Sequence, residues 1–191
     1  MHQNTFFLSL IALIVVLFSL TIAGDVVTVE DFTLNNYDGK SYSLSQFKDA
    51  KAVVIMFIAT QCPVSNAYND RMVKLYDEYA AKNVVFLGIN SNKQEDVKEI
   101  KDHAEEHKFQ FPVLKDPQNK IADKYQAQVT PEIFVVNSKH ELLYHGRIDD
   151  SRREDEIDSH DLKDALDAIL AGKPVENTET KAFGCSIKRV N

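Results

Sequence analysis

A short apolar run that changes abruptly into a helical pattern constrains this chain most. The run from Ala52 to Ile58 is rich in β-branched residues and short enough to be one buried central strand. A helix-period pattern follows it, so Cys62 lies where a strand ends and a helix begins. Pro63 suits the first helical position, where a missing N–H costs nothing. Free N–H groups and the helix dipole would stabilise a thiolate there, which makes Cys62 a candidate nucleophile; the competing interpretation is a small buried hydrophobe.

The N-terminus opens with a second apolar run, from Phe6 to Ile22. Small residues follow at Ala23 and Gly24, so we expect residues 1–23 to be a secretory signal peptide. The alternative is an uncleaved N-terminal anchor through residues 6–22, because the run approaches the length of a membrane span. Both interpretations predict an exported protein, in the periplasm or in an extracellular or secretory compartment.

The remaining residues are enough for one domain with its own core. The net charge of −7 and the absence of a basic stripe argue against a nucleic-acid partner. Two cysteines in an exported chain allow one disulfide. Because a domain of this size holds without a covalent staple, both cysteines remain available for redox chemistry.

The rest of the chain predicts alternating strands and helices. A strand, a turn ending at Gly39, a strand and a short helical piece are expected over residues 26–47. After the helix that follows Cys62, we expect these elements: a strand at 84–89, a helix at 94–107 with Val97, Ile100 and Ala104 facing inward, helical turns at 121–125, a hairpin of 133–136 with 142–145, and a helix at 161–171 capped by Ser159. This order predicts an α/β fold with a mixed central sheet flanked by helices.

Several motifs resemble a known family. Asp31-Phe32-Thr33-Leu34 and Asp38-Gly39-Lys40 are similar to the opening of the redoxin branch, and residues 57–63 are similar to its active-site strand and turn. Residues 146–150 and 184–188 resemble a peroxiredoxin-like subgroup. The resemblance to the AhpC/TSA family of alkyl hydroperoxide reductases and thiol-specific antioxidants implies a thioredoxin-like domain over residues 26–175. A C-terminal tail, 176–191, then carries Cys185.

The chain departs from the sequence motifs of both the dithiol oxidoreductases and the peroxiredoxins. Ser65 stands where dithiol oxidoreductases have their second cysteine. Ala59 and Ile55 stand where peroxiredoxins have a threonine and a proline. Thr60, one residue after the threonine position, is a further candidate for the site. The complete signature of neither activity is present.

Cys185 is the second thiol of the chain. A thiolate at Cys62 would attack either a peroxide oxygen or a disulfide sulfur, and a sulfenic acid product needs another thiol to resolve it. Cys185 is a candidate for that resolving role, for a permanent structural bridge to Cys62, or for a free thiol. The composition of residues 176–183 suggests a flexible tail that could swing toward Cys62.

Three further residues are candidates for the site. The resemblance implies a cis peptide before Pro131, which would place the Thr130 backbone beside the sulfur. Arg147 follows a strand near the end of the sheet, where it could lower the pKa of Cys62 or bind a substrate oxygen. The alternative is a solvated arginine paired with Asp149 or Asp150.

No cofactor and no metal are predicted. The acidic run from Asp149 to Asp161 lacks the spacing of a calcium loop and is expected to be solvated, and His103 and His107 are expected at the surface. Copper-delivery relatives of the fold have a second cysteine where this chain has Asn66.

The leading hypothesis is therefore an exported thiol oxidoreductase of peroxiredoxin-like type, with Cys62 as nucleophile and Cys185 as candidate resolver. Its partners would be a peroxide or a protein disulfide and an unidentified thiol reductant. The alternative is a non-catalytic thioredoxin-fold binding domain held by a structural Cys62–Cys185 disulfide.

Overall fold

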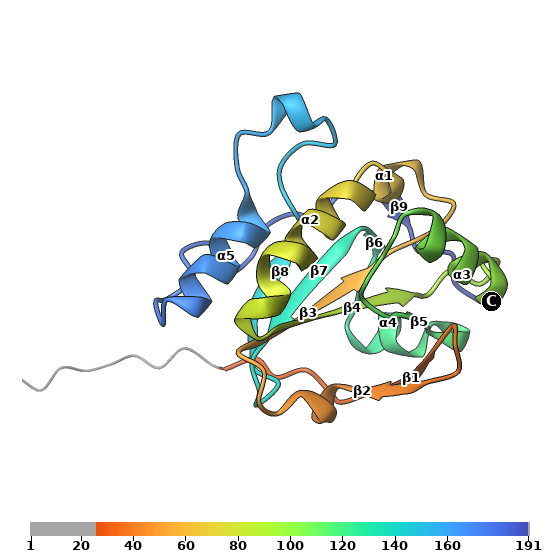
Figure 1. Ribbon diagram of the computed structural model, residues 1–191, viewed down its shortest axis with the longest axis horizontal. Helices are drawn as coiled ribbons and strands as arrows, with labels where there is room; N and C mark the ends of the chain where they lie inside the picture. Colours follow the sequence, from red (N-terminus) through yellow and green to blue (C-terminus); the bar gives the residue numbers. More distant parts are fainter. Residues whose placement is uncertain (1–25, 191) are drawn as a thin grey trace, which may run out of the picture.

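A seven-stranded mixed sheet forms the centre of the computed structural model, which describes residues 26–190 (Figure 1). The strand order is β2-β1-β5-β4-β3-β7-β8. The strands are β1 Thr33–Asn36, β2 Ser41–Ser43, β3 Ala52–Phe57, β4 Val84–Asn90, β5 Val113–Lys115, β7 Glu132–Val136 and β8 Leu142–Gly146. The helices are α1 Pro63–Asn66, α2 Asn69–Tyr79, α3 Val97–Glu106, α4 Lys120–Lys124 and α5 Asp161–Leu170, with 3-10 turns η1 Leu44–Phe47, η2 Ala80–Lys82, η3 Pro117–Asn119 and η4 Glu154–Glu156. The predicted mixed sheet is confirmed.

The apolar run that opened the sequence is the central strand β3. It pairs in parallel with β4 and antiparallel with β7, so its backbone is hydrogen-bonded on both sides. All six of its residues are buried. A strand that is covered on both faces needs apolar side chains at every position, which explains the uninterrupted run.

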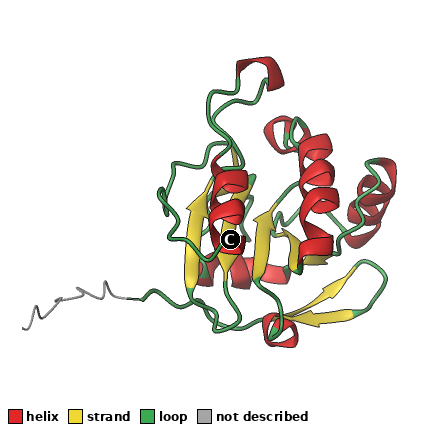
Figure 2. Ribbon diagram, turned by 60° about the vertical axis from the view of Figure 1, so that its left-hand side comes forward, coloured by secondary structure: helices red, strands yellow, loops and turns green. Residues whose placement is uncertain are grey.

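Helices cover both faces of the sheet (Figure 2). Val54 and Met56 of β3 belong to the apolar cluster that α2, α3 and α5 contribute to, whereas Ile55 and Phe57 belong to the cluster that includes α4 and η1. Successive residues of a strand point to opposite faces, so β3 serves two cores at once. The site lies at the end of this doubly covered strand.

The helix after Cys62 is interrupted, which the periodicity did not predict. A four-residue helix, α1, is separated from α2 by Ala67 and Tyr68. Met72, Leu75 and Tyr79 of α2 are buried at the spacing of one helix face. Tyr68 is buried too, but it precedes α2 rather than belonging to it, because the Tyr68 carbonyl accepts the first bond of α2 from the Met72 N–H. Side-chain spacing alone does not reveal such a break.

Two smaller expectations were wrong. Val97 is 46% exposed, because α3 begins at this residue and its buried face is formed by Ile100 and Ala104. His160, not Ser159, is the N-cap of α5, since the Ser159 hydroxyl donates to the Asp161 side chain instead of capping a backbone N–H.

The C-terminal segment is docked along the domain. Near its start, the Thr178 carbonyl accepts the His145 N–H, and the Thr180 N–H donates to the His145 carbonyl at the edge of β8. Farther on, β9, Cys185–Ser186, pairs with β6, Val129–Thr130, as a separate two-stranded sheet. The segment that the composition suggested to be flexible is thus hydrogen-bonded at both ends.

The expected signal peptide or anchor, residues 1–23, lies outside the described residues. Between residues 26 and 190, no helix has the length and apolar character needed to cross a membrane.

Candidate active site

Cys62 occupies the N-cap of α1, directly before Pro63. Its backbone is extended and its sulfur accepts the Ser65 N–H at 3.2 Å. Asn66 N–H bonds back to the Cys62 carbonyl, which closes the first turn. Cys62 is 3% exposed, so the sulfur is buried at the amide-rich start of the helix. The predicted strand-to-helix junction is present.

The docked tail brings Cys185 to the same place. Cys62 Sγ lies 3.3 Å from the carbonyl oxygen of Thr130, to which the thiol donates, and Thr130 pairs with Cys185 in the β6–β9 ladder. Figure 1 shows β9 beside β6 and α1. The Thr130–Pro131 peptide is cis, as the resemblance implied, and both cysteines are free thiols. Residues far apart in sequence therefore form one thiol pair.

Gly184 makes this approach sterically feasible. A Cβ placed on it would lie 2.0 Å from the Thr130 carbonyl oxygen, and that oxygen is also the partner of the Cys62 thiol. Only a residue without a side chain fits at this distance. The glycine before Cys185 is thus required for the tail to reach Cys62.

The two thiols have pKa values shifted in opposite directions. Burial raises the pKa of Cys62, but hydrogen bonds from the Cys185 thiol and the Ser65 N–H outweigh it, so the pKa lies below the ordinary thiol value. Burial and the neighbouring Cys62 raise the pKa of Cys185. Cys62 is therefore the thiol that ionises first.

A buried carboxylate that the sequence did not reveal organises the loop before Cys62. Glu95 accepts the N–H groups of Thr60 and Gln61 as well as the side-chain amides of Asn90 and Asn92. These bonds hold the pKa of Glu95 below its usual value despite burial. The cluster of Asn90, Asn92 and Glu95 directly after a buried strand was the available signal, since such residues commonly satisfy loop amides.

Thr60 and Arg147 do not point their side chains at the sulfur. The Thr60 hydroxyl donates to Glu99. Arg147 Nε donates to Asp161 at 2.7 Å, and its guanidinium also bonds Ser159, so its acidic partner is neither Asp149 nor Asp150. The structure does not place these two candidates in the thiol pair.

His103 is half-buried rather than a surface residue. Its Nε2 lies 3.1 Å from Asn66 Oδ1, and the Asn66 amide donates to the Thr60 carbonyl at 2.8 Å. Burial and the nearby His107 lower the pKa of His103, which favours the neutral ring. Asn66, at the position of the second cysteine in copper-delivery relatives, thus supports the loop before Cys62.

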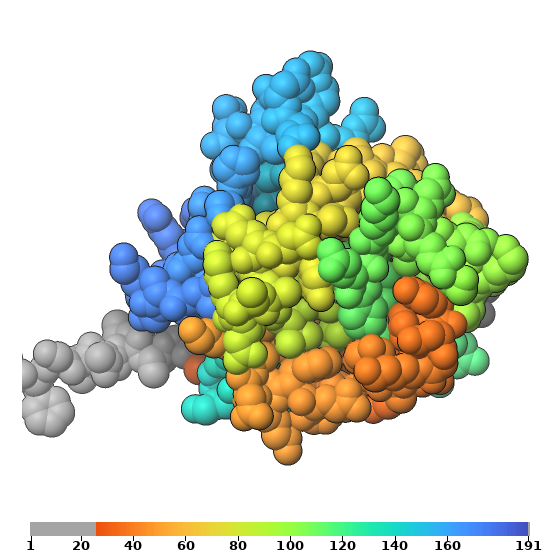
Figure 3. Space-filling view, viewed as in Figure 1, coloured from red at the N-terminus to blue at the C-terminus, as the bar shows by residue number. Residues whose placement is uncertain are grey.

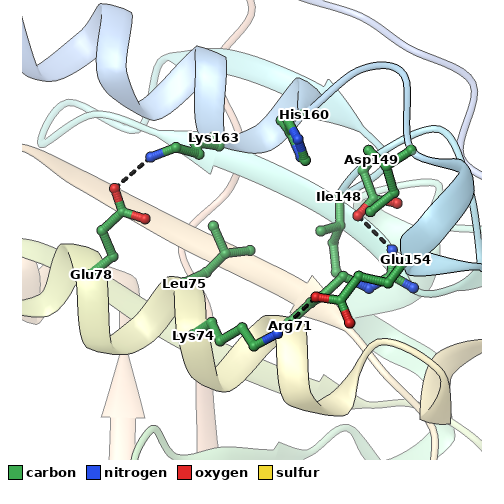
Figure 4. Close-up of a pocket in the computed structure, with 10 residues that line it drawn as sticks. Arg71, Lys74, Leu75, Glu78, Ile148, Asp149, Glu154, His160 and Lys163 are labelled. Carbon is green, nitrogen blue, oxygen red and sulfur yellow. Dashed lines mark hydrogen bonds and ion pairs between the residues drawn. The ribbon is translucent and has the colours of Figure 1, made fainter.

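The acidic run is also less solvated than predicted, because its first carboxylate is buried. Asp149 pairs with Arg71 of α2 at 2.6 Å. The two line a pocket of about 220 Å³ with an apolar floor that includes Leu75 and Ile148 (Figure 4). The rest of the loop projects from the surface above α2 (Figure 3). Within residues 26–190, no group of His, Cys, Asp and Glu side chains is arranged to hold a metal ion.

The support behind Thr130 comes from a second buried carboxylate. Glu132 accepts the N–H groups of Gln128 and Val129 on one oxygen, and its other oxygen lies 2.8 Å from His145 Nε2. The His145 backbone is where the tail docks on β8. Glu132 therefore links β6 to the docking point of the tail.

Comparisons with known proteins find relatives among thiol-disulfide oxidoreductases and peroxiredoxins. The sequence profile of the AhpC/TSA family matches residues 27–145. Thiol-disulfide oxidoreductase ResA of Geobacillus kaustophilus is 26% identical over 60% of the chain and 64% of its own length. Peroxiredoxin Q of Populus jackii is 26% identical over 65% of the chain and 62% of its own length. The chain thus covers less than two-thirds of either curated relative.

Solved structures extend the likeness to most of the chain. An uncharacterized conserved protein of Geobacillus kaustophilus superposes with a TM-score of 0.81 and 35% identity, over 86% of this chain and 92% of that one. A hypothetical protein of Sinorhizobium meliloti gives 0.80 and 31%, over 86% and 94%. Peroxidoxin BcpB of Mycobacterium tuberculosis, at 0.63 and 24% over 77% and 96%, shares the fold. The fold is thioredoxin-like, as predicted.

Proposed function

The chain belongs to the AhpC/TSA family, and from that premise we propose that it is an exported thiol oxidoreductase whose Cys62 and Cys185 alternate between a dithiol and a disulfide. The observation that carries the proposal is the shared position of the two thiols, both beside the Thr130 backbone and at the start of α1. A dithiol in one molecule can donate two electrons and close to a disulfide without a cofactor.

The reaction that the site supports best is thiol–disulfide exchange. The Cys62 thiolate attacks one sulfur of a substrate disulfide, a mixed disulfide forms, and the other substrate sulfur leaves as a thiolate that takes up a proton. Cys185 then loses its proton and attacks the Cys62 sulfur, so the first substrate sulfur leaves as the second thiol. The protein ends as a Cys62–Cys185 disulfide and the substrate has gained two electrons and two protons.

Peroxide reduction would use the same two thiols, but the surroundings favour it less. In that reaction Cys62 would become a sulfenic acid and Cys185 would release water from it. Stabilising the departing peroxide oxygen requires hydrogen-bond donors aimed at it. The Thr60 hydroxyl and the Arg147 guanidinium are instead bound to Glu99 and Asp161.

The test compares two oxidants with three proteins. Reduced wild type, Cys62→Ser and Cys185→Ser are mixed with oxidised glutathione or with hydrogen peroxide, and thiol loss is followed by mass spectrometry. We expect wild type to form an intramolecular disulfide with oxidised glutathione faster than with peroxide, Cys185→Ser to accumulate a mixed disulfide at Cys62, and Cys62→Ser to react least. Equal reaction of Cys62→Ser and wild type with both oxidants would refute the proposal.

A binding domain with a structural disulfide predicts a different result. Structural disulfides resist reduction by glutathione, whereas exchange-active ones are readily reduced. We therefore expect the Cys62–Cys185 disulfide to open in a glutathione buffer at millimolar concentration. A bond that opens only with a strong reductant favours the binding domain.

Export is part of the proposal and is supported by the apolar run from Phe6 to Ile22 followed by small residues. A protein disulfide as substrate and a thiol donor as reductant are the partners we propose. Expression of the full chain followed by N-terminal sequencing distinguishes the two interpretations of this segment. A mature protein that starts near Gly24 indicates a signal peptide, and an intact N-terminus in the membrane fraction indicates an anchor.

A further inference from the structure

A carboxylate buried behind the candidate active site holds the chain that leads to Cys62. Glu95 is 0% exposed and lies in the loop between β4 and α3. Its Oε2 accepts the Thr60 N–H at 2.9 Å and its Oε1 accepts the Gln61 N–H at 3.1 Å. Thr60 and Gln61 directly precede Cys62, so these two bonds fix the backbone on which the sulfur is mounted.

The same carboxylate reaches the tail through Asn92. The Asn92 side-chain NH₂ donates to Glu95 Oε1 at 2.8 Å, while its Oδ1 accepts the Lys188 N–H at 2.7 Å. The Lys93 N–H adds a bond to the Lys188 carbonyl at 2.9 Å. Lys188 follows Cys185 closely in sequence, so this second connection anchors the strand that carries Cys185.

From these contacts we infer that Glu95 is a positioning residue for the thiol pair: it holds the Cys62 loop and the Cys185 strand in one hydrogen-bond network and so sets how closely the two sulfurs are held. This inference rests on the proposed function and adds a determinant of its redox equilibrium. Glu95 contacts backbone and amide groups and takes part in no chemical step. Its effect is on the effective concentration of one thiol at the other.

The network needs a carboxylate at this position. Each oxygen of Glu95 accepts two donors, Oε2 from Thr60 and Asn90 and Oε1 from Gln61 and Asn92. A glutamine would turn an NH₂ group toward one of these donor pairs, and a buried donor without an acceptor is costly. If the Asn92 amide flipped so that its oxygen accepted the new NH₂ group, its own NH₂ would face the Lys188 N–H. The hydrogen bond between Asn92 and Lys188, which connects the network to the tail, would then be lost.

The experiment measures the disulfide-forming equilibrium of Glu95→Gln against a glutathione buffer. We expect the equilibrium constant to fall about tenfold, which corresponds to a reduction potential about 30 mV higher. A residue that only stabilises the fold would lower the melting temperature of both redox forms alike and leave this constant unchanged. The equilibrium constant therefore separates positioning from general stability.

Glu99→Gln is the matched control. Glu99 binds the same loop, but through the Thr60 hydroxyl and the Gln61 side-chain amide rather than the backbone. We expect its equilibrium constant to stay within about twofold of wild type, as for a partly exposed contact. Asn92→Ala keeps the bonds from Glu95 to Thr60 and Gln61, removes the link to Lys188 and should lower the constant about threefold.

The inference is overturned if Glu95→Gln is folded and keeps the wild-type constant, or, should that variant fail to fold, if Asn92→Ala keeps it. If wild type forms no Cys62–Cys185 disulfide at any glutathione ratio, the proposed function fails. Glu95 is then judged by the affinity of the reduced protein for phenylarsine oxide, which captures two neighbouring thiols without a change of oxidation state. An affinity about tenfold weaker in Glu95→Gln, or about threefold weaker in Asn92→Ala should Glu95→Gln not fold, supports the positioning role, and an unchanged affinity overturns it.

Discussion

At the scale of single residues, the environment of Cys62 favours its charged form. Hydrogen bonds from the Ser65 N–H and the Cys185 thiol to the Cys62 sulfur outweigh the effect of burial. Only the thiolate attacks a disulfide, so these neighbours decide how much of the protein is reactive near neutral pH. The raised pKa of Cys185 keeps the second thiol protonated until the first step has occurred.

The lowered pKa of Cys62 predicts a dependence of stability on pH. Because the folded pKa lies below the ordinary thiol value of 9.0, the thiolate contributes stability that is fully present above the unfolded pKa and is lost as the pH falls through the folded pKa. We expect the thiolate absorbance that wild type has and Cys62→Ser lacks to titrate with a midpoint below 9.0. A midpoint at or above that value would contradict the assignment of Cys62 as the ionised thiol.

Gly184 gives a second prediction at this scale. A methyl group there would meet the Thr130 carbonyl oxygen, so Gly184→Ala should push β9 away from β6 and separate the two sulfurs. We expect the equilibrium constant for the intramolecular disulfide to drop at least about tenfold, since the effective concentration depends on their proximity. Ser186→Ala, an exposed change in the same strand, serves as the control and should have little effect. Equal constants in the two variants would show that the tail docks without this close approach.

At the scale of elements, α2 is tied to the loop after β8 by a buried ion pair. Arg71 donates to Asp149 and to the carbonyls of Ser151 and Arg152, and its guanidinium lies over the Tyr68 ring. Removing one member of such a pair leaves the other charge buried without a partner. The contact therefore stabilises the packing of α2 against the loop after β8.

We expect Arg71→Met to lower the free energy of unfolding by about 3–5 kcal/mol, measured by urea denaturation. Lys74→Met, which removes the exposed Lys74–Glu154 pair, should cost less than about 1 kcal/mol. Similar losses in both variants would indicate that burial of the Arg71–Asp149 pair has no special role.

Some elements could be predicted from the sequence and others could not. Periodicity and turn residues predicted the central strand, the Cys62–Pro63 junction and the β7–β8 hairpin, because each is encoded by residues close together in the chain. The break between α1 and α2 was not predicted, since the buried positions keep the same spacing on both sides of Tyr68.

Residues that depend on distant contacts were predicted less well. Glu95 was predicted inside the helix at 94–107, but it lies in the loop before α3. Its main partners, the N–H groups of Thr60 and Gln61, carry no side-chain signal in the sequence. Arg147 and Thr60 were expected near the sulfur on position alone, and their side chains are bound to Asp161 and Glu99 instead. Sequence spacing gives neighbours along the chain but not the direction of a long side chain.

At the scale of the whole molecule, a Cys62–Cys185 disulfide would join the first strand-to-helix junction to the end of the chain. In the chain-entropy model, closing so long a loop is worth about 5 kcal/mol as an upper value. An exchange-active disulfide adds less to the stability of the folded protein, because its reduced form is stabilised as well. We expect the free energy of unfolding, measured by urea denaturation, to be about 1–3 kcal/mol higher for the oxidised protein than for the reduced protein. A difference near 5 kcal/mol would favour the structural staple.

Because β9 comes after all seven strands of the main sheet in sequence, the ribosome makes Cys62 long before Cys185, and the thiol pair is completed only after the main sheet has been synthesised. A protease cut between α5 and β9 would separate Cys185 from the rest of the domain, so an assay that finds no turnover needs an intact-mass measurement beside it.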